Sequence, residues 1–205
     1  MNRLIVVSIC CLVFTTACVT PLKVVDVNAP SVNCVFDPSC KVVVNDSTAT
    51  IPIPSGGTNF LQSRTFTGKP GAPANGLYAY EYRIDLRNAM GITHIPCISS
   101  LTIDFGPAVS ALDYNGDGTV GDQVYVVTSG GLGSIGLASA EKEDSKITFT
   151  FSSPVCAGGH PGDGQSTFFF GLVSTQQPKY VTATVKDTYG NEYNVEARAP
   201  QLSGP

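Results

Sequence analysis

Hydrophobic and polar side chains alternate with a period of two over much of the chain from Leu77 onward. The clearest example is residues 77–86, whose two alternating sets are Tyr78, Tyr80, Tyr82, Ile84 and Leu86 on one side and Glu81, Arg83 and Asp85 on the other. Successive side chains of a β-strand point to opposite faces of a sheet, so this pattern predicts a strand with one buried and one exposed face. The tyrosine row is predicted to lie in the core or at its rim, with a sugar-stacking platform as the alternative.

Further segments with the same period, or with a short apolar run, each predict a strand: residues 101–105, 124–127, 147–151, 168–173, 181–185 and 193–197. The last two flank Asp187 to Asn191, whose glycine and asparagine suit a hairpin turn. Phe168 to Phe170 breaks the alternation, which predicts a strand that is buried on both faces or bent at a bulge. No stretch of a dozen residues has the helical period. The sequence therefore predicts an all-β protein, an antiparallel β-sandwich of immunoglobulin-like or jelly-roll type with roughly seven to nine strands.

The first residues of the chain are expected to form an export signal. Residues 1–17 contain a single basic residue, Arg3, followed by an uncharged apolar run and then by small residues. A membrane-spanning helix needs about 20 apolar residues, so this shorter run indicates a cleaved signal peptide. Residues 18–57, with their prolines and short apolar runs, are expected to form an N-terminal tether with one or two edge strands. Residues 58–205 are expected to form the sandwich as one domain.

The end of the signal, Phe14 to Cys18, reads FTTAC and resembles the lipobox of bacterial lipoproteins, with Thr15 at the position where leucine is most common. The resemblance implies that Cys18 becomes the mature N-terminus and carries fatty-acyl chains such as palmitate, which would anchor the protein to a membrane. Ordinary cleavage after Ala17, leaving a plain thiol at Cys18, is the alternative. We expect an exported protein of the cell envelope, at the outer membrane or the cell surface.

Seven cysteines are present, and their positions fit this view. Cys10 and Cys11 lie in the signal and Cys18 at the processing site, which leaves Cys34, Cys40, Cys97 and Cys156. Exported chains meet an oxidising environment, where an even set of cysteines predicts disulfides. Three pairings are possible, of which we favour Cys34 with Cys40 and Cys97 with Cys156, because residues 35–39 make a natural small loop. Zinc is the competing use, but no CxxC pair exists and His94 and His160 do not have ligand spacing.

Composition narrows the possible partners. Charged residues make up only 14% of the chain and the net charge is −4, with no basic cluster. Nucleic acids are bound by concentrated Lys and Arg surfaces, so nucleic acid is not expected as a partner. The 21 glycines and 14 prolines fit strands that are joined by many turns.

One loop carries candidate metal chemistry. Asp113, Asn115, Asp117 and Gly118 fit the first six positions of the EF-hand pattern and resemble the D-x-N-x-D-G loops of dockerins and other extracellular calcium modules. In such loops, oxygens at alternate positions converge on one calcium ion, the backbone carbonyl at the position of Thr119 adds another ligand, and the glycine permits the sharp turn. The twelfth position is Val124 instead of the usual glutamate, so Asp122 is the candidate for the missing carboxylate. A plain hairpin turn is the alternative, because Asn-Gly and Asp-Gly both favour turns.

Two other motifs do not carry a function. Gly131 to Gly136 is a literal G-x-G-x-x-G, but residues 137–146 are too short and too charged for the crossover helix of a dinucleotide fold, so no dinucleotide is expected. His160 lies in a glycine-rich turn, and no G-x-S-x-G elbow provides a serine partner for it.

The sequence thus contains no complete catalytic constellation. We expect a non-enzymatic, exported and lipid-anchored binding or structural protein with a calcium-stabilised loop and a protein or glycan partner at the cell surface. The alternative is a carbohydrate-binding module or an accessory domain of a secreted enzyme.

Overall fold

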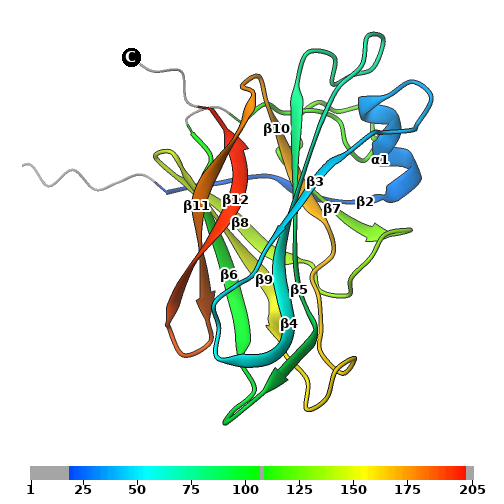
Figure 1. Ribbon diagram of the computed structural model, residues 1–205. Helices are drawn as coiled ribbons and strands as arrows, with labels where there is room; N and C mark the ends of the chain where they lie inside the picture. Colours follow the sequence, from blue (N-terminus) through cyan, green and yellow to red (C-terminus); the bar gives the residue numbers. More distant parts are fainter. Residues whose placement is uncertain (1–18, 107–108, 202–205) are drawn as a thin grey trace, which may run out of the picture.

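The computed structural model describes residues 19–106 and 109–201, which form two six-stranded sheets and one short helix (Figure 1). In spatial order, the first sheet consists of β1 (Val19–Pro21), β8 (Leu137–Glu143), β9 (Lys146–Cys156), β6 (Cys97–Asp104), β11 (Pro178–Asp187) and β12 (Glu192–Pro200). The second sheet consists of β2 (Val24–Asn28), β7 (Val124–Ser129), β10 (Phe170–Ser174), β5 (Tyr78–Gly91), β4 (Ser55–Thr67) and β3 (Asn45–Ala49). The helix, α1 (Ala29–Phe36), follows β2 directly.

The predicted all-β sandwich is confirmed. Every strand pair is antiparallel except β2 with β7, which is parallel. The described part of the chain has twelve strands, more than the seven to nine expected, because β1, β2, β3, β4 and β8 do not show a clean alternation. Residues 19–57 supply β1, β2, α1, β3 and the start of β4, and the first three of these strands lie at sheet edges.

The main core lies between the two sheets. Tyr80 and Tyr82 are fully buried in it, and their hydroxyls donate hydrogen bonds to the backbone oxygens of Gln176 and Arg198, each at 2.6 Å. Tyrosine hydroxyls need such partners when the ring is buried. Tyr80 and Tyr82 are therefore part of the core, where their rings are closed off from a sugar, and Tyr78 is partly buried at the rim.

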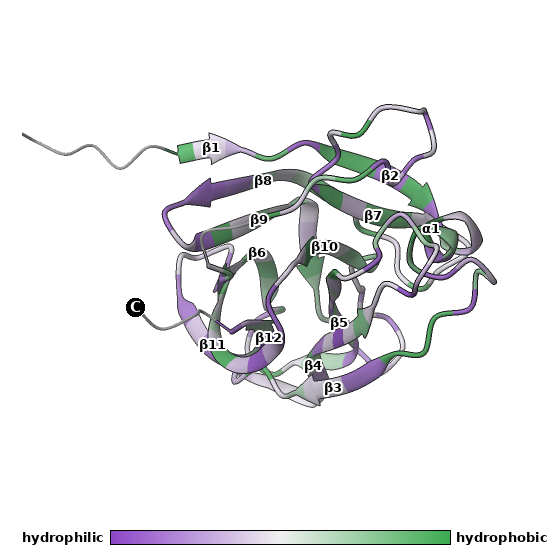
Figure 2. Ribbon diagram, turned by 90° about the horizontal axis from the view of Figure 1, so that it is seen from above, coloured by the Kyte–Doolittle hydropathy of each residue, from purple (hydrophilic) through white to green (hydrophobic). Residues whose placement is uncertain are grey.

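The second sheet is also covered on its outer face. In β7, Val124 and Val126 point into the main core, whereas Tyr125 and Val127 belong to a second apolar cluster on the opposite face. Helix α1 contributes Phe36 to this outer cluster and lies beside β2 and β7, as Figures 1 and 2 show. Phe170 packs in the main core and Phe169 in the outer cluster, so the predicted burial of this strand on both faces is confirmed.

This outer layer corrects one expectation about β5. The set predicted to face solvent is buried: Glu81, Arg83 and Asp85 are only 7%, 4% and 4% exposed. The alternating pattern places these side chains on the opposite face from the tyrosines, as expected, but that face is covered as well. Helix α1 lies across the pocket from Glu81, Phe169 packs against Arg83, and Asp85 is bridged to Ser166.

Local signals explain the helix and the turns. Helix α1 has only eight residues, too few to show a helical period, but proline in its first turn after Asn28 is a typical start signal. In the β11–β12 hairpin, Asp187 accepts hydrogen bonds from the backbone amides of Tyr189 and Asn191, and Gly190 has a φ of 89°. The predicted turn at this position is therefore present.

Both predicted disulfides are confirmed. Cys34 is bonded to Cys40, which ties the end of α1 to the following loop, and Cys97 is bonded to Cys156 across β6 and β9. In the part of the chain that the structure describes, no helix has the length and apolar character needed to cross a membrane. Cys18 and the signal segment lie outside the described residues.

Candidate functional site

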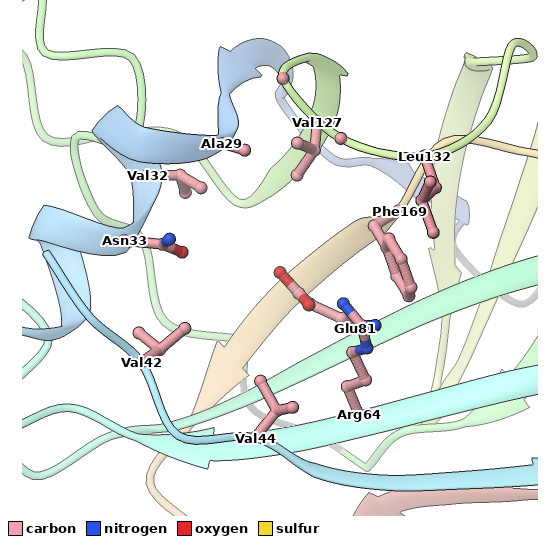
Figure 3. Close-up of a pocket in the computed structure, with 12 residues that line it drawn as sticks. Ala29, Val32, Asn33, Val42, Val44, Arg64, Glu81, Val127, Leu132 and Phe169 are labelled. Atoms are coloured by element: carbon pink, nitrogen blue, oxygen red, sulfur yellow. The ribbon is translucent and has the colours of Figure 1, made fainter.

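A pocket of about 360 Å³ opens on the outer face of the second sheet, beside α1 (Figure 3). Helix α1 forms one wall, the segment that leads into β3 a second, and β7 with the glycine-rich turn that follows it a third. The floor is made by β4 and β5. The lining residues are Ala29, Val32, Asn33, Val42, Val44, Arg64, Glu81, Val127, Gly130, Gly131, Leu132 and Phe169.

Glu81 is the acidic group of this pocket. It lies on β5, and its carboxylate points into the pocket toward α1 in Figure 3. Tyr125 lies on the outer face of β7, and its buried hydroxyl donates a hydrogen bond to Glu81 Oε1 at 3.0 Å. Burial raises the pKa of Glu81 from its ordinary value of 4.5 to about 7, although the Tyr125 hydrogen bond and the Arg64 charge act in the opposite direction. The carboxyl therefore changes its charge close to neutral pH.

Arg64 is the basic group, and its position is set by two contacts. Its guanidinium carbon lies 3.9 Å from the centroid of the Phe169 ring, and its Nε lies 3.3 Å from Asp46 Oδ2 on β3. A guanidinium over an aromatic face is attracted by the ring, and the adjacent carboxylate balances its charge. Arg64 is thus held in the pocket wall as part of an existing pair.

The pocket has mostly apolar walls and few polar side chains. Among the described residues that line it, one carboxyl, one guanidinium and one amide are the only polar side chains, and the other side chains are apolar. Nucleophilic catalysis requires a hydroxyl, thiol or amine beside a base, and general acid and base catalysis by carboxyls commonly uses a pair of them. The lining instead combines apolar surface with a few oriented polar groups, which is typical of small-ligand sites.

The G-x-G-x-x-G motif has a packing role in this region. A Cβ on Gly131 would lie 2.9 Å from a methyl group of Val127, and one on Gly133 would lie 2.1 Å from the backbone oxygen of Thr167. The residues after the motif form β8 instead of a helix. These glycines therefore allow the turn to pass close to its neighbours at the rim of the pocket.

The acidic loop of residues 113–122 forms a closed turn away from this pocket. Leu112 and Asp122 are paired in an antiparallel bridge, so the chain does double back. The Asp113 carboxylate accepts hydrogen bonds from the backbone amides of Gly116, Asp117 and Gly118 at 2.8 to 3.1 Å.

The other candidate ligands of the loop lie in two different environments, the exposed turn and the buried end of the loop. Asp117 accepts a hydrogen bond from the Thr119 amide, and Asn115 contacts the Asp117 carboxylate, so both belong to the exposed turn. Asp122 is fully buried, accepts a hydrogen bond from the Tyr114 amide at 3.0 Å, and has its Oδ1 2.7 Å from Lys23 Nζ. Within residues 19–106 and 109–201, no cluster of three or more carboxylate, imidazole or thiol groups is placed to hold a metal ion.

The histidines lie elsewhere. His160 is exposed in its turn, with Nδ1 3.3 Å from Asp163 Oδ2, and His94 packs edge-on against the Tyr189 ring.

No protein-family model, curated protein or solved structure matches the chain. Its site residues are therefore assigned from their geometry and chemistry. The pocket residues Glu81, Arg64 and Phe169 were not predicted as a site, because they come from β5, from β4 and from the residue just before β10, which only the fold brings together.

Proposed function

We propose that the mature protein is a non-enzymatic binding protein of the bacterial cell envelope that holds a small ligand in the pocket beside α1. The observation that carries this proposal is the buried Glu81 carboxyl, which points into a cavity with mostly apolar walls. Burying a carboxyl is costly unless a partner compensates for the loss of water. A bound ligand is a natural compensating partner.

The export signal and the two disulfides support a location outside the cytoplasm. We propose that Cys18 carries the lipid anchor. Cys18 directly precedes β1, which pairs with β8, so an acylated Cys18 would hold the sandwich close to the membrane surface.

Binding can be tested with three simple probes that share one apolar chain: n-hexylamine, hexanol and hexanoate. We expect at least one of them to shift the backbone amide signals of Glu81, Val127 and Gly131 in an NMR titration of the mature protein. Val44→Trp, at a half-buried position in the pocket wall outside the strands, should fill the cavity and abolish these shifts. If all shifts fall elsewhere, or if none occurs, the pocket is not a ligand site.

The anchor has an independent test. Metabolic labelling with a fatty-acid analogue should mark the wild-type protein and leave Cys18→Ala unlabelled. Wild-type protein without label would rule out the anchor and would leave the pocket proposal standing.

We further propose that the loop of residues 113–122 binds calcium, with oxygens of Asp113, Asn115, Asp117, Thr119 and Asp122 as the candidate ligands. Hydrogen bonds within the turn hold the first four of these residues close together. Asp122 is paired with Lys23, so a calcium ion would have to displace that ammonium before Asp122 could act as a ligand. Extracellular calcium modules bind at about 0.1 to 1 mM, and ligand at a hundredfold its dissociation constant stabilises the folded state by about 2.7 kcal/mol. Millimolar calcium should therefore give a smaller but measurable rise in melting temperature.

The structure indicates which variant tests the calcium site most cleanly. Asp113 accepts three backbone hydrogen bonds, so Asp113→Ala should destabilise the loop even in a chelator. Asp117→Asn keeps an oxygen for the Thr119 amide and loses only the charge and one exposed hydrogen bond from the Asn115 side chain. It should therefore lose the calcium-dependent shift while its melting temperature in chelator stays close to that of wild type. A wild-type melting temperature that does not respond to calcium or chelator would leave the loop as a hairpin turn.

A further inference from the structure

Few charged groups surround the Glu81 carboxyl. The charged or titratable groups that face it are Arg64 from β4, Asp46 from β3 and Tyr125 from β7. Helix α1 contributes Ala29, Val32 and Asn33, and the turn after β7 contributes Gly130, Gly131 and Leu132, so neither adds a charge.

The cations near Glu81 already have acidic partners. Arg64 is paired with Asp46, and Arg83, the next residue on the same face of β5, lies 3.1 Å from Asp85 and donates a hydrogen bond to Gln62. Among the described residues, Glu81 itself makes no ion pair. The pocket therefore contains one carboxyl without a cation of its own.

One oxygen of this carboxyl is available to a ligand. Oε1 accepts the Tyr125 hydrogen bond, and no described residue donates a hydrogen bond to Oε2. In Figure 3 the carboxylate points toward α1 across the open space, with Val32 and Val44 on the surrounding walls. A ligand group that enters the pocket would meet an acidic hydrogen-bond acceptor surrounded by apolar surface.

We propose that the pocket binds a small organic cation, a primary ammonium group on a short apolar body, with the ammonium against Glu81 and the apolar part against the valine walls. This inference rests on the proposed role as a small-ligand-binding protein and names the class of ligand. A primary ammonium supplies both the missing charge and the hydrogen-bond donors for Oε2. An anionic ligand would instead place a further negative charge beside Glu81 and Asp46.

Because Glu81 changes its charge near neutral pH, the affinity for an ammonium ligand should depend on pH. With a pKa of about 7, the carboxyl is mostly protonated at pH 6 and mostly ionised at pH 8. A cation binds the ionised form, and the apparent affinity scales with the fraction of protein in that form. Binding of an ammonium probe should therefore be roughly tenfold tighter at pH 8 than at pH 6, whereas a carboxylate probe should show the opposite trend.

The test compares n-hexylamine, hexanol and hexanoate on the mature protein at pH 6 and pH 8, with NMR titration of the pocket amides as the readout. The amine is charged at both pH values, as a lysine side chain is. We expect hexylamine to bind most tightly and to show the roughly tenfold pH dependence. Glu81→Gln, which keeps the shape of the side chain, should lose both the preference for the amine and the pH dependence.

A second variant, which keeps Glu81, serves as a control for structural effects of Glu81→Gln. Tyr125→Phe removes the hydrogen bond that favours the ionised carboxyl, so the midpoint of the pH dependence should move upward while the amine still binds. Preference for hexanoate, or equal binding of all three probes, would overturn the cation inference and leave the binding role intact. Absence of binding by every probe would overturn both.

Discussion

The buried Glu81 carboxyl should make the stability of the fold depend on pH in a direction that is unusual for an acidic residue. Its pKa rises from 4.5 to about 7 on folding, because burial disfavours the charged form. Below pH 4.5 the carboxyl is protonated in both states and no stability is lost. Between pH 4.5 and about 7 the unfolded chain has released this proton while the folded state still holds it, so the stability of the folded state falls across this interval and levels off above it.

The size of this effect follows from the interval between the two pKa values. Each pH unit corresponds to about 1.4 kcal/mol, so the free energy of unfolding should fall by about 3 kcal/mol between pH 4.5 and pH 8 on account of Glu81 alone. Glu81→Gln has no ionisable group at this position and retains an oxygen that can accept the Tyr125 hydrogen bond. The variant should match wild type within about 0.5 kcal/mol at pH 4.5 and exceed it by about 3 kcal/mol at pH 8.

Urea unfolding of both proteins at pH 4.5, 6 and 8 measures this difference. Taking the difference removes the contributions of the other titrating groups, which the two proteins share. Tyr125→Phe is the matched control, since the loss of its hydrogen bond should extend the pH-dependent loss to higher pH. A difference between wild type and Glu81→Gln that is the same at all three pH values would refute the claim that the carboxyl is buried and protonated near neutral pH.

Three further predictions concern the scaffold. Replacing Cys97 and Cys156 by alanine opens a loop with a sequence separation of 59 residues, and the chain-entropy model predicts a loss of about 4 kcal/mol in urea unfolding. Tyr82→Phe removes a buried hydrogen bond to a backbone oxygen of β12 and should cost about 1 to 3 kcal/mol in the same assay. The Lys69 ammonium, together with Ser39, lowers the pKa of Asp37 to about 2. Wild type should therefore lose stability relative to Asp37→Asn as the pH falls from 4 through 2 in acid titrations followed by circular dichroism.

Much of the fold could be predicted from the sequence because local patterns specify it. The period-two segments predict seven of the strands, the cysteine positions favour the observed disulfides, and the glycine at position 190 marks the last hairpin. In each case the information lies within a short stretch of chain.

The missed strand β4 shows where such reasoning fails. Its buried polar residues Gln62 and Thr65 look like surface or loop residues in the sequence. Gln62 donates a hydrogen bond to Asp46, 16 residues earlier, and accepts one from Arg83, 21 residues later. Buried polar groups are stable only when such partners arrive. No local pattern of hydrophobic and polar residues contains that information.

The same reasoning explains why the pocket was missed and why Glu81 is its most informative residue. The outer face of β5 looks solvent-exposed because it carries Glu81, Arg83 and Asp85, yet all three side chains are buried in the fold. Arg83 and Asp85 balance each other as an ion pair, so their burial has a structural explanation. Glu81 lacks such a partner, although an apolar side chain in its place would be expected to make the sheet more stable. Places where a sequence departs from what stability alone favours tend to be functional, and here the departure coincides with the cavity.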